Sequence, residues 1–113
     1  LIVSMPCKFD PSSPIIFEAV ERVQSFMPHA KIVVHDSNSE DQSYLDDARL
    51  RDTEIILNNT GYETSAIWNT YTAFPDEDYY FFLHDSFLIK NSMNPFMNGF
   101  LVFSLVKSIS KDI

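Results

Sequence analysis

Short apolar runs alternate with amphipathic segments along most of this chain. Four of the runs are rich in β-branched and aromatic residues, and each is bounded by turn-forming residues and is too short for a helix. Such runs are typical of buried strands. We expect these strands at residues 1–5, 31–35, 53–57 and 79–83.

Three segments between the predicted strands have the spacing of helices. The first is expected to begin with Ser13 as its N-cap and Pro14 in the first helical position, and to end at Pro28. A short helix is expected at 44–51, and a third helix ends at Pro75. This alternation predicts an α/β fold, with a mostly parallel open sheet of about four strands and helices on both faces.

The predicted α/β domain spans residues 1–90, and residues 91–113 form a C-terminal extension. Within that extension, residues 100–109 fit either a pair of strands or a helix. Because the sequence begins with Leu1 inside a predicted strand, we expect an excised piece of a soluble protein. The single cysteine and the lack of a targeting signal lead us to expect a cytoplasmic location. No apolar stretch reaches the roughly 20 residues that a membrane-spanning helix needs.

Charge and cysteine content narrow the function classes. The 113 residues include 16 acidic and 8 basic side chains, for a net charge of −8, which argues against a nucleic-acid-binding protein. Such a chain could still hold a phosphorylated ligand if a divalent cation mediates the contact. Cys7 is the single cysteine, so an internal disulfide and a cysteine-rich zinc site are both excluded.

Two of the predicted strands end in the same three residues, His-Asp-Ser, at 35–37 and 84–86. In open α/β sheets, ligands bind just outside the carboxyl ends of the strands, so this edge predicts a site for a metal-bound or ribose-bearing ligand. Asp85 could bridge a divalent ion to a diphosphate, with His84 as a weaker candidate ligand. Asp36 could accept hydrogen bonds from a ribose or a base. A turn-forming role is the alternative for both aspartates.

The turn at 58–61 and the helix after it carry further candidates. Gly61 is expected to permit either a positive φ or a close backbone approach at the start of the helix. Glu63 is expected to stabilise the helix through its dipole, and Trp68 is expected in the core. His35 is expected to be a sheet residue that faces away from the neighbouring aspartate.

The order of these features resembles the nucleotide-sugar half of a GT-A-type glycosyltransferase. In such proteins the first strand runs into a proline-containing loop, as at Pro6, and the second strand ends in an aspartate, as at Asp36. An Asn-x-Gly turn follows the third strand, as at Asn59 to Gly61. The fourth strand ends in an Asp-x-Asp metal motif, whose place is taken here by His84-Asp85-Ser86.

A poorly characterised GT-A-like group is similar in more detail over about residues 1–90. Its members carry Asn-x-Gly-x-Glu, then a helix, then Leu-Pro-Asp and a strand that ends in Phe-Leu-His. The corresponding residues here are 59–63, 74–76 and 82–84. In family-2 enzymes an Arg-Asn pair often follows the glycine turn, and this chain lacks that pair at the expected place.

The resemblance implies transfer of a hexose from a UDP- or GDP-sugar to an unknown acceptor. It implies a cofactor, Mn²⁺ or Mg²⁺, held by Asp85 with His84. The residues it implies for nucleotide binding are Met5, Pro6, Cys7, Asp36, Asn59 and Gly61. The acceptor half of such enzymes lies downstream, so residues 91–113 would then be the start of a truncated acceptor part.

Two alternatives remain open. The first is a non-catalytic binding or interaction domain of the same fold, in which residues 96–103 offer apolar surface to a partner. The second is a receiver-like phosphoacceptor module, in which strand-end aspartates bind magnesium. It is the weaker of the two, because no predicted strand ends in the lysine that such modules need; Lys90 follows the same strand as Asp85.

Overall fold

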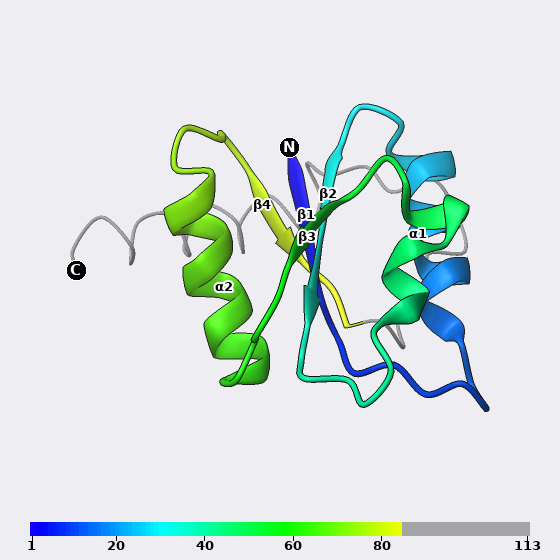
Figure 1. Ribbon diagram of the computed structural model, residues 1–113. Helices are drawn as coiled ribbons and strands as arrows, with labels where there is room; N and C mark the ends of the chain where they lie inside the picture. The colour runs from blue at the N-terminus through cyan, green and yellow to red at the C-terminus, as the bar shows by residue number, and fades with distance from the viewer. Residues whose placement is uncertain (85–113) are drawn as a thin grey trace.

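Residues 1–84, which the computed structural model describes, form a four-stranded parallel sheet with a helix on each face (Figure 1). The strands are β1 (Ile2–Cys7), β2 (Lys31–Asp36), β3 (Glu54–Ile56) and β4 (Tyr80–Phe82), and the helices are α1 (Ile15–Phe26) and α2 (Tyr62–Ala73). The strands lie in the order β3-β2-β1-β4, and every neighbouring pair is parallel. The predicted α/β architecture is confirmed for these residues.

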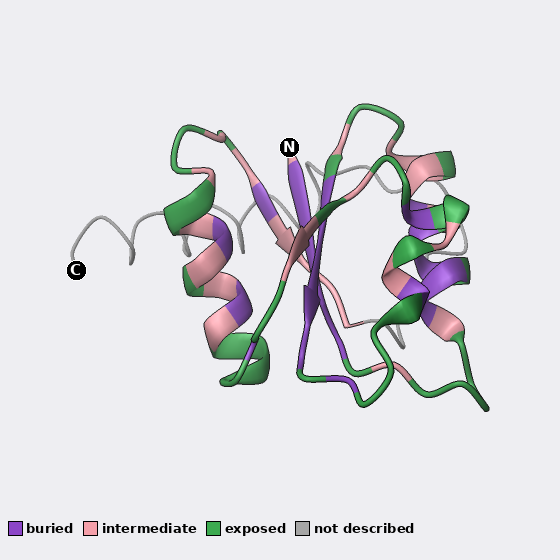
Figure 2. Cartoon of the chain, viewed as in Figure 1, coloured by how far each residue is buried: buried purple, intermediate pink, exposed green. Residues whose placement is uncertain are grey.

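Strand β1 lies at the centre of the sheet, and all six of its residues are buried (Figure 2). Alternate residues of β1 serve the two faces. Val3, Met5 and Cys7 pack in the core under α1, whereas Ile2 packs with Tyr80 on the face that α2 covers. Burial on both faces explains why this strand is a nearly continuous apolar run in the sequence.

Helix α1 begins one residue later than the sequence predicts. Pro14 is the N-cap rather than the first helical residue, and no side chain caps the helix. The expected role of Ser13 as N-cap is therefore wrong; its carbonyl instead accepts a hydrogen bond of 2.8 Å from the amide of Ile15. The residues of α1 that face the sheet are Ile16, Phe17, Ala19, Val20 and Val23.

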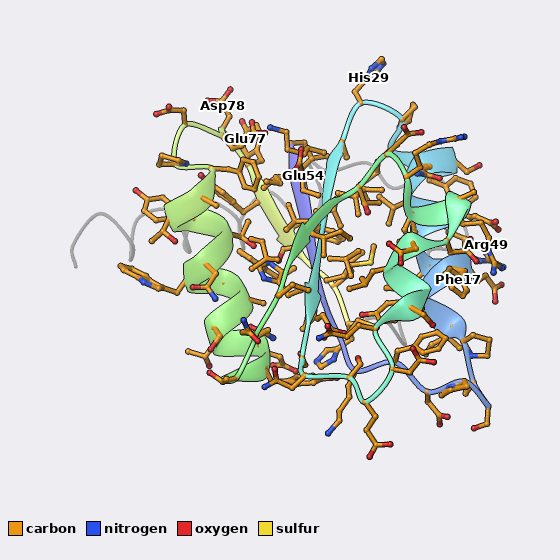
Figure 3. The ribbon with its side chains drawn as sticks, in the orientation of Figure 1. Phe17, His29, Arg49, Glu54, Glu77 and Asp78 are labelled. Carbon is orange, nitrogen blue, oxygen red and sulfur yellow. The ribbon has the colours of Figure 1, made fainter. Side chains whose placement is uncertain are left out.

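The short helix expected at 44–51 is not formed. Its place is taken by two 3₁₀ turns, Ser43–Asp46 and Ala48–Leu50, separated by Asp47 in an extended conformation (ψ 138°). The Asp47 side chain accepts a hydrogen bond from the amide of Arg49, so it caps the second turn and interrupts the first. Arg49 also stacks on the ring of Phe17, 3.7 Å from its centroid, which joins these turns to α1 (Figure 3).

Helix α2 presents a different face to the sheet from the one expected. Its buried residues are Ala66 and Thr70, whereas Trp68 is 46% exposed, so the expected place of Trp68 in the core is wrong. Trp68 lies two positions from each buried residue, and residues two apart in a helix face in different directions. Neither helix within residues 1–84 is long and apolar enough to cross a membrane.

The strand order creates a switch point between β1 and β4. From β1 the chain continues to β2 and β3 on one side and then crosses to β4 on the other. In open α/β sheets, ligands bind at the carboxyl ends of the strands beside such a point. The segment after β1 and the start of α2 lie at this end of the sheet (Figure 1). Asp85, Lys90 and residues 91–113 lie outside the described residues.

Candidate functional site

The Asp36 carboxylate at the end of β2 is fully buried and accepts four hydrogen bonds. Tyr44 Oη and Ser39 Oγ each donate to Oδ1 over 2.6 Å, while the Ser39 amide (3.2 Å) and Gln42 Nε2 (2.9 Å) donate to Oδ2. Burial raises the pKa of Asp36, but the bonds from Ser39, Tyr44 and Gln42 outweigh burial, and the pKa lies below its usual value. Burial raises the pKa of Tyr44, which stays a donor.

These four donors occupy the acceptor positions of both carboxylate oxygens. A ribose or base could reach Asp36 only by displacing them, so in this conformation the carboxylate shapes the loop after β2. The geometry matches the turn-forming alternative for Asp36.

His35 faces the opposite side of the sheet, as predicted, and contacts α2. Its Nε2 lies 2.6 Å from Thr70 Oγ1, which lies 2.8 Å from Ser4 Oγ, so the three side chains form one buried network. His35 Nδ1 is buried and has no hydrogen-bond partner among the described residues. Burial lowers the pKa of His35 to about 4, so the imidazole is neutral near pH 7.

The turn before α2 is held by Asn59, which is 2% exposed. Asn59 Nδ2 donates to Ser37 Oγ (2.9 Å) and to the carbonyl of Tyr62 (2.8 Å), so it ties the end of β2 to the start of α2. Its Oδ1 is buried without a partner among residues 1–84. Asn59 therefore positions the turn, and its amide presents no exposed surface to a ligand.

The positive φ expected at Gly61 occurs at its neighbour instead. Gly61 is the N-cap of α2 with φ −96°, whereas Tyr62 has φ 51°, which is unusual for a bulky residue. The other expectation for Gly61 was a close backbone approach, but the atoms that a Cβ here would crowd belong to the Ser65 side chain, and the Ser65 backbone nitrogen would lie at an ordinary contact distance of 3.4 Å. A Cβ at this position would clash with Ser65 Oγ and lie 3.2 Å from Ser65 Cβ.

Gly61→Ala is expected to lower the free energy of unfolding by about 1 kcal/mol, since Ser65 must change rotamer to admit the new methyl group. Adding Ser65→Ala should recover most of that loss. Urea denaturation of the two single variants and the double variant measures the coupling. Equal losses with and without Ser65→Ala would contradict the contact.

A cavity of about 250 Å³ opens at the carboxyl end of β1, and we call it the β1 cavity. Cys7 lines it from the last position of β1, Lys8 and Asp10 line it from the segment after β1, and Tyr62 lines it from the start of α2. Lys8 is exposed, and Tyr62 is 38% exposed. The cavity thus combines a cation, a carboxylate and an aromatic ring at the switch point.

A second, smaller cavity of about 90 Å³, the α2 cavity, lies between α2 and the end of β4. Apolar side chains form most of it: Pro6, Ala66, Ile67, Phe82 and Leu83. Glu63 and His84 complete the lining, and His84 Nε2 contacts Glu63 Oε1. The pair joins the first turn of α2 to the chain after β4.

The residues that the resemblance implied for nucleotide binding do not line a single cavity. Cys7 lines the β1 cavity and Pro6 lines the α2 cavity, while Met5 is fully buried in the core under α1 and belongs to the lining of neither. Alternation along β1 explains this split, because successive side chains face opposite sides of the sheet. Asn59 and Gly61 form the turn before Tyr62, and Tyr62 lines the β1 cavity.

Three residues at these cavities were missed as site residues: Lys8, Tyr62 and Glu63. A lysine directly after a buried strand was a usable signal for Lys8. The pairing of Glu63 with His84 depends on the return of β4 beside β1, and no local pattern reports it.

The described residues only partly fit a divalent ion. Within residues 1–84 no group of three or more histidine, cysteine, aspartate or glutamate side chains is gathered at one point. His84 and Glu63 supply one nitrogen and one oxygen donor side by side. The other predicted ligand, Asp85, follows His84 in the chain and lies outside the described part.

Comparison of this chain with protein-family models, with curated proteins and with solved structures finds no match.

Proposed function

We propose that this chain is the nucleotide-sugar-binding part of a metal-dependent glycosyltransferase. It would bind a UDP- or GDP-sugar at the carboxyl edge of the sheet and take part in hexose transfer. The observation that carries the proposal is the β1 cavity, which opens beside the switch point of the parallel sheet.

The side chains of the β1 cavity suit a nucleotide. The Lys8 ammonium would neutralise part of the diphosphate charge, and the exposed ring of Tyr62 would stack on the base. The positive φ of Tyr62 supports this role, because strained backbone of this kind gathers at ligand-binding sites.

A divalent ion would supply the remaining charge neutralisation. Bound to the diphosphate, such an ion acts as a Lewis acid that stabilises the leaving group. The sequence assigns Asp85 and His84 to this ion. The excess of acidic residues in the chain favours a metal bridge to the phosphates, since a divalent cation reduces their repulsion by the negative chain.

Titration of the chain with UDP and then GDP, in Mn²⁺ and again in EDTA, tests the proposal. We expect calorimetric binding of one nucleotide that needs the metal and weakens about tenfold or more in Asp85→Ala and in Lys8→Gln. In this proposal Lys8 would contact the diphosphate and Asp85 would hold the ion, so each variant removes one charge on which binding depends.

Matched controls lie at the opposite edge of the sheet. Asp78 precedes β4 at this edge (Figure 3). Lys31 begins β2, and its ammonium lies 4.6 Å from the centroid of the Phe74 ring. Asp78→Ala and Lys31→Gln therefore make the same charge changes as Asp85→Ala and Lys8→Gln, but at the edge opposite the β1 cavity. Both should leave nucleotide affinity unchanged. Absence of nucleotide binding with and without metal would overturn the proposal.

Exposed aromatic surface on α2 favours the alternative of a non-catalytic interaction domain. Trp68 is 46% exposed on the middle of the helix. Tryptophan is enriched among the residues that dominate the binding energy of protein–protein interfaces. This alternative becomes the better description if no nucleotide binds.

A further inference from the structure

We propose that protonation of His35 releases helix α2 from the sheet, so that mildly acidic pH opens the side of the domain that α2 covers. The inference goes beyond the proposed function, because it concerns a conformational change of the chain itself. It does not depend on which ligand the β1 cavity binds.

The His35 imidazole is enclosed between the sheet and α2, and it uses only one of its two nitrogens. Nε2 lies 2.6 Å from Thr70 Oγ1 of α2, and Thr70 Oγ1 lies 2.8 Å from Ser4 Oγ of β1, so these side chains connect two strands to the helix. Nδ1 is buried without a hydrogen-bond partner in the described part of the chain. A neutral imidazole fits this setting as the tautomer with its proton on Nε2, since Nδ1 then needs no acceptor.

A second proton on His35 would occupy the nitrogen that lacks a partner. An imidazolium donates from both nitrogens, so Nδ1 would become a buried, charged donor that no described residue accepts from. Burial of an unpaired charged donor is costly, and the cost disappears when water reaches the ring. Displacement of α2, the helix that covers this face of the sheet, would admit that water (Figure 1).

No charged group among residues 1–84 offsets an imidazolium at this position. The residues opposite His35 in the sheet are Pro6 of β1 and Ile56 of β3, and the neighbouring Asp36 carboxylate faces the other side. Burial alone lowers the pKa of His35. The titratable side chains on this face of the sheet and on α2 form no described hydrogen bond or ion pair with His35; they are Lys31, Glu54, Glu63, Tyr71, Tyr80 and His84.

Helix α2 is held more weakly than α1 by the described residues. Only Ala66 and Thr70 are buried among the 12 residues of α2, against five of the 12 residues of α1. Elements with few buried contacts open at a lower free energy than the rest of a domain. We therefore expect α2 to open first, and its release would remove Tyr62 from the lining of the β1 cavity.

Hydrogen–deuterium exchange of the full chain, measured by mass spectrometry on peptides from α1 and α2, tests the inference. We expect protection factors in α2 to lie below those in α1, and to fall about 20-fold between about pH 7 and about pH 5. The pKa of His35 is about 4 while α2 covers it, and about 6.5 once the ring is exposed. Between these values the open form binds a proton that the closed form does not, so opening increases as the pH falls.

Two variants assign the effect to one histidine. In His35→Gln the fall in α2 protection should disappear, because glutamine cannot take up the proton. His84→Gln is the matched control, since it removes the other histidine that contacts α2, through Glu63, and the fall should persist.

Equal protection of α1 and α2 at both pH values would overturn the inference, because acid would then act only through unfolding of the whole domain. This comparison needs no variant. Protection of α2 that does not change with pH would overturn it as well. So would a fall of the same size in His35→Gln, since another group would then cause the opening.

Discussion

Lowering the pH from about 7 to about 4.5 is expected to reduce the free energy of unfolding by about 2 kcal/mol through His35 alone. Burial holds the pKa of His35 near 4 in the folded chain, against about 6.5 in the unfolded chain. Between these two values the unfolded chain binds a proton that the folded chain does not, so stability falls as the pH falls. The loss is complete once the pH passes below the folded pKa, and it is absent above about pH 7.

Urea denaturation at several pH values, followed by Trp68 fluorescence, measures this slope. His35→Gln keeps a polar group near Thr70 but cannot take up a proton, so its stability should vary much less across the same pH range. His29→Gln is the control, because His29 is exposed in the turn before β2 and is solvated in both states (Figure 3). An equally steep slope in His35→Gln would show that another group causes the acid sensitivity.

Asp36→Asn is expected to cost about 3 kcal/mol of unfolding free energy, a large share of the stability of a domain of this size. The substitution keeps the shape of the side chain but replaces an acceptor oxygen with an NH₂ group. That group would face donors that now point at the carboxylate, such as Gln42 Nε2 and the Ser39 amide. Buried donors left without an acceptor account for most of the loss.

Asp41→Asn in the same loop provides the comparison. The Asp41 carboxylate is exposed and accepts a hydrogen bond of 2.9 Å from the Ser43 amide, a bond that an asparagine can also accept. Its replacement should change stability little. If both variants lost the same stability, charge in the loop and not the buried network would be responsible.

Tyr44→Phe removes a single donor from the Asp36 network and should cost less than Asp36→Asn does.

Periodicity predicted the layered architecture correctly because the apolar residues of β1 and β2 are buried on both faces and leave no polar alternation. The replacement of the expected helix at 44–51 by two 3₁₀ turns was harder to predict. Residues 44–51 include acceptable helix formers. However, the Tyr44 hydroxyl donates a hydrogen bond to Asp36, and the Asp47 side chain caps the 3₁₀ turn that follows it. Both interactions are specific to this tertiary setting, and helix propensity does not contain them.

For the candidate site, too, the sequence indicated the overall location but not the roles of individual residues. Strand-end polar residues pointed to the carboxyl edge of the sheet, and the β1 cavity lies at that edge. The sequence did not separate Asp36, which is enclosed by its own loop, from Lys8, which is exposed at a cavity. Trp68 was misassigned because α2 carries apolar residues around its circumference, so spacing alone did not identify the buried face.

The central place of β1 has a consequence for how the chain is made. Its first strand pairs on one side with β2 and on the other with β4, so Ile2 lies opposite both Lys31 and Tyr80. During synthesis the β1–β2 pair can form early, but the other edge of β1 has no partner until residues 80–82 have left the ribosome. Until then, an apolar strand with open hydrogen-bonding groups is exposed to other chains. Closure of the sheet is therefore a late event, and sequences that slow translation shortly before β4 would lengthen the period in which the nascent chain needs a chaperone.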